Sequence, residues 1–329
     1  FTLHRLFLLR LLICLFGVAL AGVRTSYAQA QNYPTKPIKL IVPFPPDAGT
    51  DLVARLVAQK LGEQMNGTLV VDNKTGAGGA IGAEFVAHAD GDGYTLLFVA
   101  SPFTTVAAAS ATAGYDPVRQ FVPVAPIASG PLAFVVGNAV PAATMKEFLA
   151  LARQRPGALN YGSAGPGSVN HLALELLKAR TGTDIVHVPY NGPAAGITAV
   201  GSGEAQAMIV SVTTARGLAQ AGKVRALALF AAKRTPLLPD VPTAAEAGFG
   251  EIDLSAWIGL VAPAGTPAEI VEKLNREIEQ ILRAPAGVAW ADSQGLEAIG
   301  GSAASFAATI ENDRSRWTGA VKKLGVAAR

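Results

Sequence analysis

Short runs of apolar residues alternate along the chain with longer stretches whose apolar residues recur at helical spacing. Residues 38–42, 69–71 and 95–99 are apolar runs of strand length. Between the first two runs, the apolar side chains of residues 52–61 fall on one face of a helix. Strands that alternate with helices in this way predict an α/β fold, with a parallel sheet and helices on both of its faces.

The same alternation returns in the second half of the chain. Further strands are predicted over residues 132–136, 159–161, 185–188, 207–210, 224–229 and 256–261, with helices between them. An amphipathic stretch over 305–324 predicts a terminal helix. At about 100–200 residues per domain, a chain of 329 residues favours two domains. Because no low-complexity linker separates them, we expect the chain to cross between the two domains more than once.

Several predicted helices begin with side chains that can cap free N–H groups. Residues 144–147 and 266–269 both fit the capping box, in which a threonine and a glutamate satisfy these groups reciprocally. We also expect Ser168 to cap the helix that follows it, and Thr50 or Asp51 to cap the first helix. These signals place the helix starts directly after glycine- and hydroxyl-rich loops.

The first 30 residues have the form of an export signal. A positive region with Arg5 and Arg10 precedes 13 apolar residues, 11–23, and Ala28 and Ala30 then fit the small-x-small pattern of a signal-peptidase site. A membrane-spanning helix needs about 20 apolar residues, so this run is short for a span. We therefore predict that residues 1–30 are a signal peptide, cleaved after about Ala30, and that the mature protein is periplasmic. A retained anchor and a lipoprotein modified at Cys14 are the alternatives.

The charge and the cysteine content exclude several classes of protein. The formal net charge is +3, but three of the 27 Lys and Arg residues lie in the leader, and the other 24 equal the 24 Asp and Glu residues. A balanced body has no basic field for phosphate backbones, so we expect no nucleic-acid partner. Cys14 is the single cysteine. Disulfides, thiolate nucleophiles and cysteine-ligated zinc are therefore excluded for the mature chain.

No local motif indicates catalysis. Residues 217–223 fit GxxxxGK, but Val224 stands where a phosphate-binding loop needs a hydroxyl, and Tyr161 stands where a nucleophile elbow around Ser163 needs glycine. The histidines of the mature chain are His88, His171 and His187, and their spacing is not that of zinc ligands. We therefore expect no catalytic residue, metal or cofactor.

Four glycine- and hydroxyl-rich loops lie between predicted strand ends and helix starts. They cover residues 46–50, 76–80, 101–104 and 163–168. Such loops present backbone N–H groups and the positive end of a helix dipole, which together bind anions such as carboxylates. In an open α/β sheet, ligands lie beyond the carboxyl ends of the strands. The four loops therefore predict a ligand cleft.

A series of motifs resembles the periplasmic solute-binding proteins of tripartite tricarboxylate transporters, the Bug family. The series begins with YPTKPIKLIVPFPP at 33–46 and continues with Gly49-Thr50-Asp51, DNKTGAGG at 72–79, DGYTLL at 92–97, NYGSAG at 160–165, HVPYNG at 187–192, LPDVPT at 238–243 and APAGTP at 262–267. In this order the motifs span nearly the whole mature chain.

The resemblance implies a type 2 periplasmic-binding-protein fold, a Venus flytrap with two α/β lobes and a ligand cleft between them. We place lobe one at 31–131 plus 256–329, and lobe two at 132–255. The implied function is capture of a small organic ligand, a carboxylate or a compound with carboxylate and amide groups, for a membrane permease or a sensor kinase. We expect a monomer without enzymatic activity. An exported α/β hydrolytic enzyme remains the alternative.

The resemblance also implies the residues that bind the ligand. Carried onto this chain, they are Phe44, Pro46, Asp47, Ala48, Gly49, Thr50, Ser101, Phe103, Ser163, Ala164, Gly165, Ser168, Tyr190 and Asn191. Two departures from the family pattern concern charge. Asp47-Ala48 replaces the usual Gly-Gly of the first loop, and an acid usual near Gln206 is missing. Asp47 would repel a carboxylate that approaches it, so it either favours a ligand that donates a hydrogen bond or points away as a cap.

Overall fold

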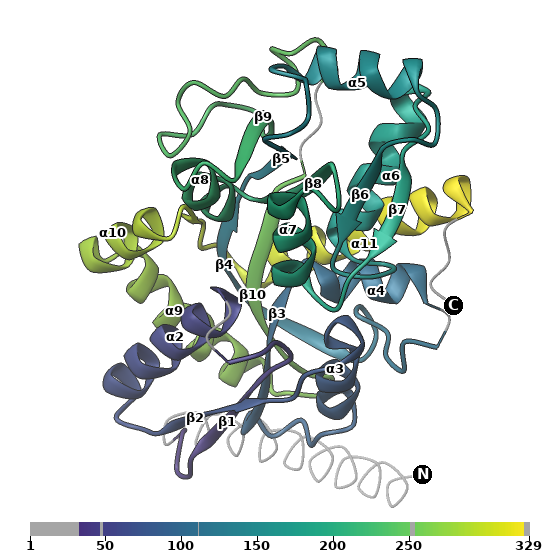
Figure 1. The fold of residues 1–329 in the computed structure, drawn as a ribbon. Coiled ribbons are helices and arrows are strands. Elements are labelled where there is room, and N and C mark those ends of the chain that lie inside the picture. The colour runs from purple at the N-terminus through teal and green to yellow at the C-terminus, as the bar shows by residue number, and fades with distance from the viewer. Residues whose placement is uncertain (1–32, 47–48, 111, 251–253, 326–329) are drawn as a thin grey trace, which may run out of the picture.

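Figure 1 shows the chain as a computed structural model that describes residues 33–46, 49–110, 112–250 and 254–325. The predicted signal peptide, its cleavage site at Ala30 and Cys14 lie outside the described residues. So do Asp47 and Ala48 of the first predicted ligand loop.

Two sheets form the framework of the molecule. The first has six strands in the order β11-β4-β10-β3-β1-β2. Its strands are β1 (Ile38–Val42), β2 (Leu69–Asn73), β3 (Thr95–Ala100), β4 (Phe121–Gly130), β10 (Ala256–Pro263) and β11 (Glu297–Ala298). The second has five strands in the order β7-β6-β8-β5-β9. Its strands are β5 (Leu132–Gly137), β6 (Asn160–Ser163), β7 (Val186–Pro189), β8 (Ala207–Ser211) and β9 (Val224–Phe230).

The parallel pairing expected for the first three strands is confirmed, but each sheet as a whole is mixed. β1 pairs in parallel with β2 and β3, as the alternating pattern predicts, but β10 runs antiparallel to both β3 and β4. In the second sheet β6 is parallel to β7 and β8, whereas β5 is antiparallel to β8 and β9. The antiparallel strands lie where the chain passes between the sheets. β4 continues into β5 through Pro131, and the chain returns from the second sheet to the first between β9 and β10.

β4 was absent from the predicted strands, and its sequence explains why. Pro123 and Pro126 interrupt its apolar pattern, and proline is expected only at strand edges or bulges. The pairing of β4 with β10 has two register shifts, and Pro123 and Pro126 are the residues that resume the ladder after them. Bulges therefore allow a central strand to hold two prolines.

The helices cover both sheets, as the two halves of Figure 1 show. They are α2 (Gly49–Met65), α3 (Ala80–Ala87), α4 (Pro102–Ala109), α5 (Met145–Gln154), α6 (Val169–Thr181), α7 (Pro193–Ser202), α8 (Val212–Gln220), α9 (Ala268–Arg283), α10 (Pro285–Ser293) and α11 (Ala303–Leu324), with a short 3-10 turn at Ala77–Gly79.

Two of the four predicted caps are confirmed. The Thr144 hydroxyl accepts a hydrogen bond from Glu147 N, and the Ser168 hydroxyl accepts one from His171 N. The Thr266 prediction was wrong, because that hydroxyl donates to Pro263 O and α9 begins after Pro267. The prediction for the first helix was also wrong. α2 begins at Gly49, which places Thr50 and Asp51 inside its first turn.

The terminal helix α11 packs into the cores of both halves. Phe306 and Ile310, near its start, belong to an apolar cluster that contains residues of β1, β3 and β10. Trp317, nearer its end, belongs to the cluster formed by β5, α5 and α6. At the centre of the helix, the buried Asp313 accepts hydrogen bonds from Thr104 Oγ1 of α4 and, at 3.1 Å, from Trp257 Nε1 of β10. One helix therefore completes the packing of two sheets.

Candidate functional site

The loop after β1 is held at both ends by the side chain of Asn73. Asn73 Nδ2 donates to Phe44 O at 2.9 Å, at the start of the loop, and to Asp51 Oδ1 at 2.7 Å, in the first turn of α2. Arg55 donates to the other carboxylate oxygen of Asp51 at 2.7 Å and to Asn73 Oδ1 at 3.0 Å. The Asp51 side chain is fully buried. An ionic network of Asp51, Arg55 and Asn73 thus fixes the loop that carries the first group of predicted ligand contacts.

The predicted contacts of this loop differ in exposure. Phe44 is half-buried and packs against the core of the first sheet, whereas Pro46 and Gly49 are exposed. Thr50 is half-buried in the first turn of α2. The loop can therefore present backbone groups and the Thr50 hydroxyl, while Phe44 anchors its beginning.

The predicted contacts after β3 are engaged within the fold. Ser101 N donates to Trp257 O at 3.1 Å, and Ser101 Oγ accepts from Trp257 N at 2.9 Å. The Phe103 ring is buried, stacks on Tyr115 at 5.3 Å and meets Phe121 edge-on at 5.1 Å. These side chains bind α4 to the crossing strand β10 and to an aromatic cluster, which fixes the position of the loop.

The loop after β6 is closed by its own hydrogen bonds. Ser163 is fully buried, and its Oγ accepts from Gly165 N at 3.0 Å. Ser168 Oγ donates to Gly165 O at 2.6 Å, and Gly167 N donates to His171 Nδ1 at 3.1 Å. The predicted contacts Ser163, Gly165 and Ser168 therefore form one compact turn at the start of α6, beside the half-buried Ala164.

Two histidines stack behind this turn. The His187 ring lies between Tyr161, at 4.9 Å, and His171, at 4.1 Å between ring centroids. His187 Nε2 is 2.6 Å from Ser163 Oγ. Burial lowers the pKa of His187 to about 4, helped by the neighbouring His171, and burial also lowers the pKa of His171. Both imidazoles are therefore neutral at pH 7, and the Ser163 hydroxyl can donate to His187 Nε2.

Tyr190 and Asn191 follow β7, which pairs with β6. Tyr190 N donates to Ser163 O at 3.1 Å, and its hydroxyl donates to Glu204 Oε1 at 3.0 Å. Asn191 is exposed beside it. The structure thus brings Tyr190 and Asn191 to the turn that contains Ser163. Contact between α4 and α6 makes the predicted contacts after β3 and β6 parts of adjoining elements.

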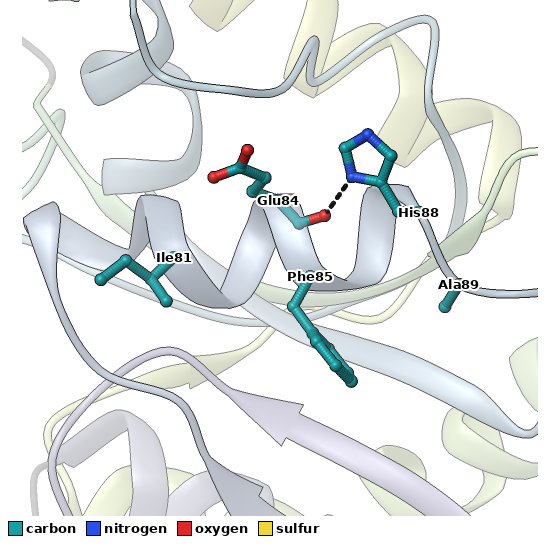
Figure 2. A pocket seen from close by; sticks show the side chains of 5 residues that line it. All are labelled: Ile81, Glu84, Phe85, His88 and Ala89. Atoms are coloured by element: carbon teal, nitrogen blue, oxygen red, sulfur yellow. Dashed lines mark hydrogen bonds between the residues drawn. The ribbon is translucent and has the colours of Figure 1, made fainter.

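A surface cavity of about 410 Å³ lies on another part of the molecule. It runs along α3 and is lined by Ile81, Glu84, Phe85, His88 and Ala89, as Figure 2 shows. His88 Nδ1 is 2.9 Å from Glu84 O, in the preceding turn of the helix. None of the predicted ligand contacts lines this cavity.

The arrangement of the described residues bears on metal binding, membrane insertion and catalysis. No cluster of three His, Cys, Asp or Glu side chains that could hold a metal occurs among them. No helix in this part of the chain is long and apolar enough to span a bilayer.

Ser163 and His187 have the spacing of a nucleophile and its base. Ser163 is 0% exposed, however, so a substrate carbonyl cannot reach its hydroxyl in this conformation.

Comparison with known proteins decides the family. The sequence profile of the TctC family, described as the Tripartite tricarboxylate transporter family receptor, matches residues 53–326. The chain belongs to the TctC family. Its TctC relatives include BugT of Bordetella pertussis, 33% identical over 94% of this chain and 95% of the other. They also include a UPF0065 protein from the tcbD-tcbE intergenic region of Pseudomonas sp. strain P51, 38% identical over 92% and 91% of the two chains.

Solved TctC structures share the fold. Rpa4515 of R. palustris, solved with adipate, is 36% identical, has a TM-score of 0.83, and is matched over 90% of this chain and 99% of its own. MatC of Rhodopseudomonas palustris, solved with bound malate, is 30% identical with a TM-score of 0.80, over 88% of this chain and 100% of its own. The periplasmic binding protein BugD is 30% identical with a TM-score of 0.81, over 90% and 100%. The predicted Bug-family membership, the two-lobe periplasmic-binding-protein fold and the function of a solute-binding receptor are confirmed.

Two features of the site were missed from the sequence. Asp51 was interpreted as a helix cap, whereas its partner Asn73 lies 22 residues away on another strand. His171 and His187 were treated as separate residues, although both touch the turn after β6. Asn73 and His187 both lie in motifs that carry the resemblance to the Bug family. Those motifs were the signal in the sequence that could have pointed to these two residues.

Proposed function

We propose that this TctC receptor captures a small carboxylate between two lobes, 31–131 plus 256–329 and 132–255, and delivers it to a membrane permease. The observation that carries the proposal is the likeness, at 36% identity and a TM-score of 0.83, to a protein solved with adipate. A relative solved with malate supports the same class of ligand. Delivery to a sensor kinase is the alternative for the partner.

We propose that the ligand lies between the loop after β1 and the turn after β6. Backbone N–H groups and hydroxyls at helix starts suit a carboxylate without a basic side chain. The proposed contacts are those predicted from the sequence, with Thr50 offering its hydroxyl and the residues after β3 and β6 contributing through their backbone. Asp47 is proposed to set the class of ligand, as a carboxylate that opposes a second negative charge in the site.

Export is the second part of the proposal. The mature receptor would begin after Ala30 and work in the periplasm. Mass spectrometry of the protein recovered from a periplasmic extract should give the mass of a chain that starts at Gln31. An intact leader, or a lipid on Cys14, would contradict cleavage at this site.

The binding proposal is tested with the mature protein and a panel of malate, succinate, adipate, citrate and nicotinamide. A ligand at 100 times its Kd stabilises the folded state by about 2.7 kcal/mol, which raises Tm by several degrees. We expect at least one dicarboxylate to do so, with calorimetry giving its Kd. No shift with any carboxylate would contradict the proposal. Turnover of p-nitrophenyl esters that is lost in Ser163→Ala would favour the hydrolase, which the spacing of Ser163 and His187 brings into consideration.

A further inference from the structure

Two histidines far apart in sequence each hold one hydrogen bond of the turn after β6. His187 Nε2 is 2.6 Å from Ser163 Oγ, and His171 Nδ1 accepts from Gly167 N at 3.1 Å. Their rings are nearly parallel, 19° apart, with centroids separated by 4.1 Å. Because the rings touch, a shift of one imidazole displaces the other, and the two ends of the turn are coupled through the stack.

The bond to Gly167 fixes the protonation of His171. A backbone N–H can donate only to an imidazole nitrogen that carries no proton, so the proton of neutral His171 lies on Nε2. Gly167 is itself buried and has a φ of 76°, a conformation that favours glycine. Loss of the acceptor would leave a buried N–H group without a partner, which costs more than the hydrogen bond contributes.

Burial keeps the stack neutral, and the charged groups of α6 that face it are paired with each other. Glu175 and Lys178 of α6 face it, and Lys178 Nζ binds Glu175 Oε1 at 2.6 Å. Tyr161 of β6 donates its hydroxyl to the same carboxylate at 2.7 Å. Of the other elements that pack on α6, α4 and β8 have no charged residue, and the buried Asp313 of α11 is bonded to Arg316.

We propose that His171 is a positioning residue of the ligand site, whose unprotonated Nδ1 holds the turn 163–168 in its binding conformation through Gly167, with His187 holding Ser163 in the same stack. The inference deepens the proposed function, on which it rests for the role of the turn. Protonation of Nδ1 in acid removes the acceptor, so the turn should loosen at low pH before the protein unfolds.

Substitutions at position 171 separate the acceptor from the ring. In His171→Asn, Oδ1 is bonded to Cγ as Nδ1 is in histidine, so the acceptor is kept and the titration is removed. In His171→Leu, a side chain of similar size has no acceptor. His88, exposed directly after α3 and lining the cavity of Figure 2, supplies the matched control His88→Asn.

The first measurement needs no ligand. Hydrogen exchange of the Gly167 amide should be faster in His171→Leu than in wild type by roughly fivefold to tenfold, the factor for one lost hydrogen bond. It should be unchanged in His171→Asn and His88→Asn. After correction for intrinsic rates, exchange in wild type should accelerate on acidification, and exchange in His171→Asn should not. Nitrogen NMR of wild type should show Nδ1 unprotonated at pH 7. Equal exchange in all four proteins, or a protonated Nδ1, would overturn the proposal.

The second measurement is the affinity for malate and adipate at pH 7 and pH 5. His171→Leu should weaken binding roughly fivefold or more at both values of pH. Wild type should lose more affinity at pH 5 than His171→Asn, whose loss reports only the protonation of the dicarboxylate itself. If exchange behaves as expected but neither dicarboxylate binds wild type, the proposed function fails and the positioning of the turn stands. If binding is normal in His171→Leu, the positioning role is wrong and the proposed function stands.

Discussion

The two lobes hold the loops that we propose to bind the ligand with different chemistry. In the first, a buried carboxylate, Asp51, is paired with Arg55, whose side chain is 47% exposed, and Asn73 ties both to the loop after β1. In the second, two neutral imidazoles hold a turn that begins at Ser163. One arrangement depends on charge and the other on the absence of charge. We therefore expect added salt to weaken the ion pair that holds the first loop, and mild acid to weaken the imidazole contacts that hold the second.

The largest expected effect comes from removal of the charge in the first loop. Asp51→Ala removes the acceptor of one N–H of the Asn73 side-chain amide and of one guanidinium N–H of Arg55. We expect the free energy of unfolding to fall by about 2–3 kcal/mol, less than for a fully buried ion pair because Arg55 is partly exposed. Urea unfolding measures the change. Asp72→Ala, which removes a partly exposed acid one residue beyond the middle of β2, should cost under about 0.5 kcal/mol. Equal losses in the free energy of unfolding of the two variants would contradict the role given to charge in the first loop.

The second largest effect is expected from acid, which should weaken the contacts that His187 makes with the turn after β6. The pKa of His187 lies near 4 in the folded protein and near 6.5 otherwise, so the unfolded chain binds more protons between these values. Stability from this group is complete above about pH 6.5 and is lost as the pH falls towards 4. After allowance for solvent, we expect a loss of about 1.5–2 kcal/mol. Unfolding midpoints at intervals from pH 7.5 to 4.5 should fall more steeply in wild type than in His187→Gln, and parallel curves would contradict the assignment.

Charge in the first loop should also govern affinity. Asp47→Gly removes a negative charge from the ligand loop. If Asp47 faces the ligand, succinate should bind roughly tenfold more tightly, about 1.4 kcal/mol, while nicotinamide should bind more weakly. Calorimetry with both compounds on wild type and variant decides this. Unchanged affinities for every ligand that binds would show that Asp47 is a cap.

Salt should have the smallest effect and should act on one loop alone. Because Arg55 is partly exposed, raising NaCl from about 0.05 M to about 0.5 M should reduce the contribution of its pair with Asp51 by a few tenths of a kcal/mol. Urea unfolding of wild type and Asp51→Ala at the two concentrations isolates that contribution. Exchange of the Gly167 amide should not respond to salt, because its acceptor is neutral. A response there would show that charge reaches the second loop as well.

The difference between the loops also explains what the sequence could predict. The alternating pattern predicted the strands over 132–136 and 207–210 because apolar runs and helix caps are local signals. It missed β4, since the bulges that accommodate Pro123 and Pro126 depend on the partner strand β10. Hydrogen bonds from Asn73 to Asp51 and a stack of two histidines join residues 16 to 22 positions apart. No periodicity encodes such pairs, because each joins a residue of a helix to a residue of a strand that the helix meets only in the folded chain.

The packing of α11 has a consequence for the order in which this protein can fold. Trp317 fills the cluster under β5, and Phe306 fills the cluster between β3 and β10, although β5 and β3 are made some 170 to 220 residues earlier. Neither cluster is complete until α11 has been synthesised. A chain that lacks α11 therefore lacks part of both cores. Packing of both cores thus depends on α11, and a truncation before Phe306 would leave both halves unfinished.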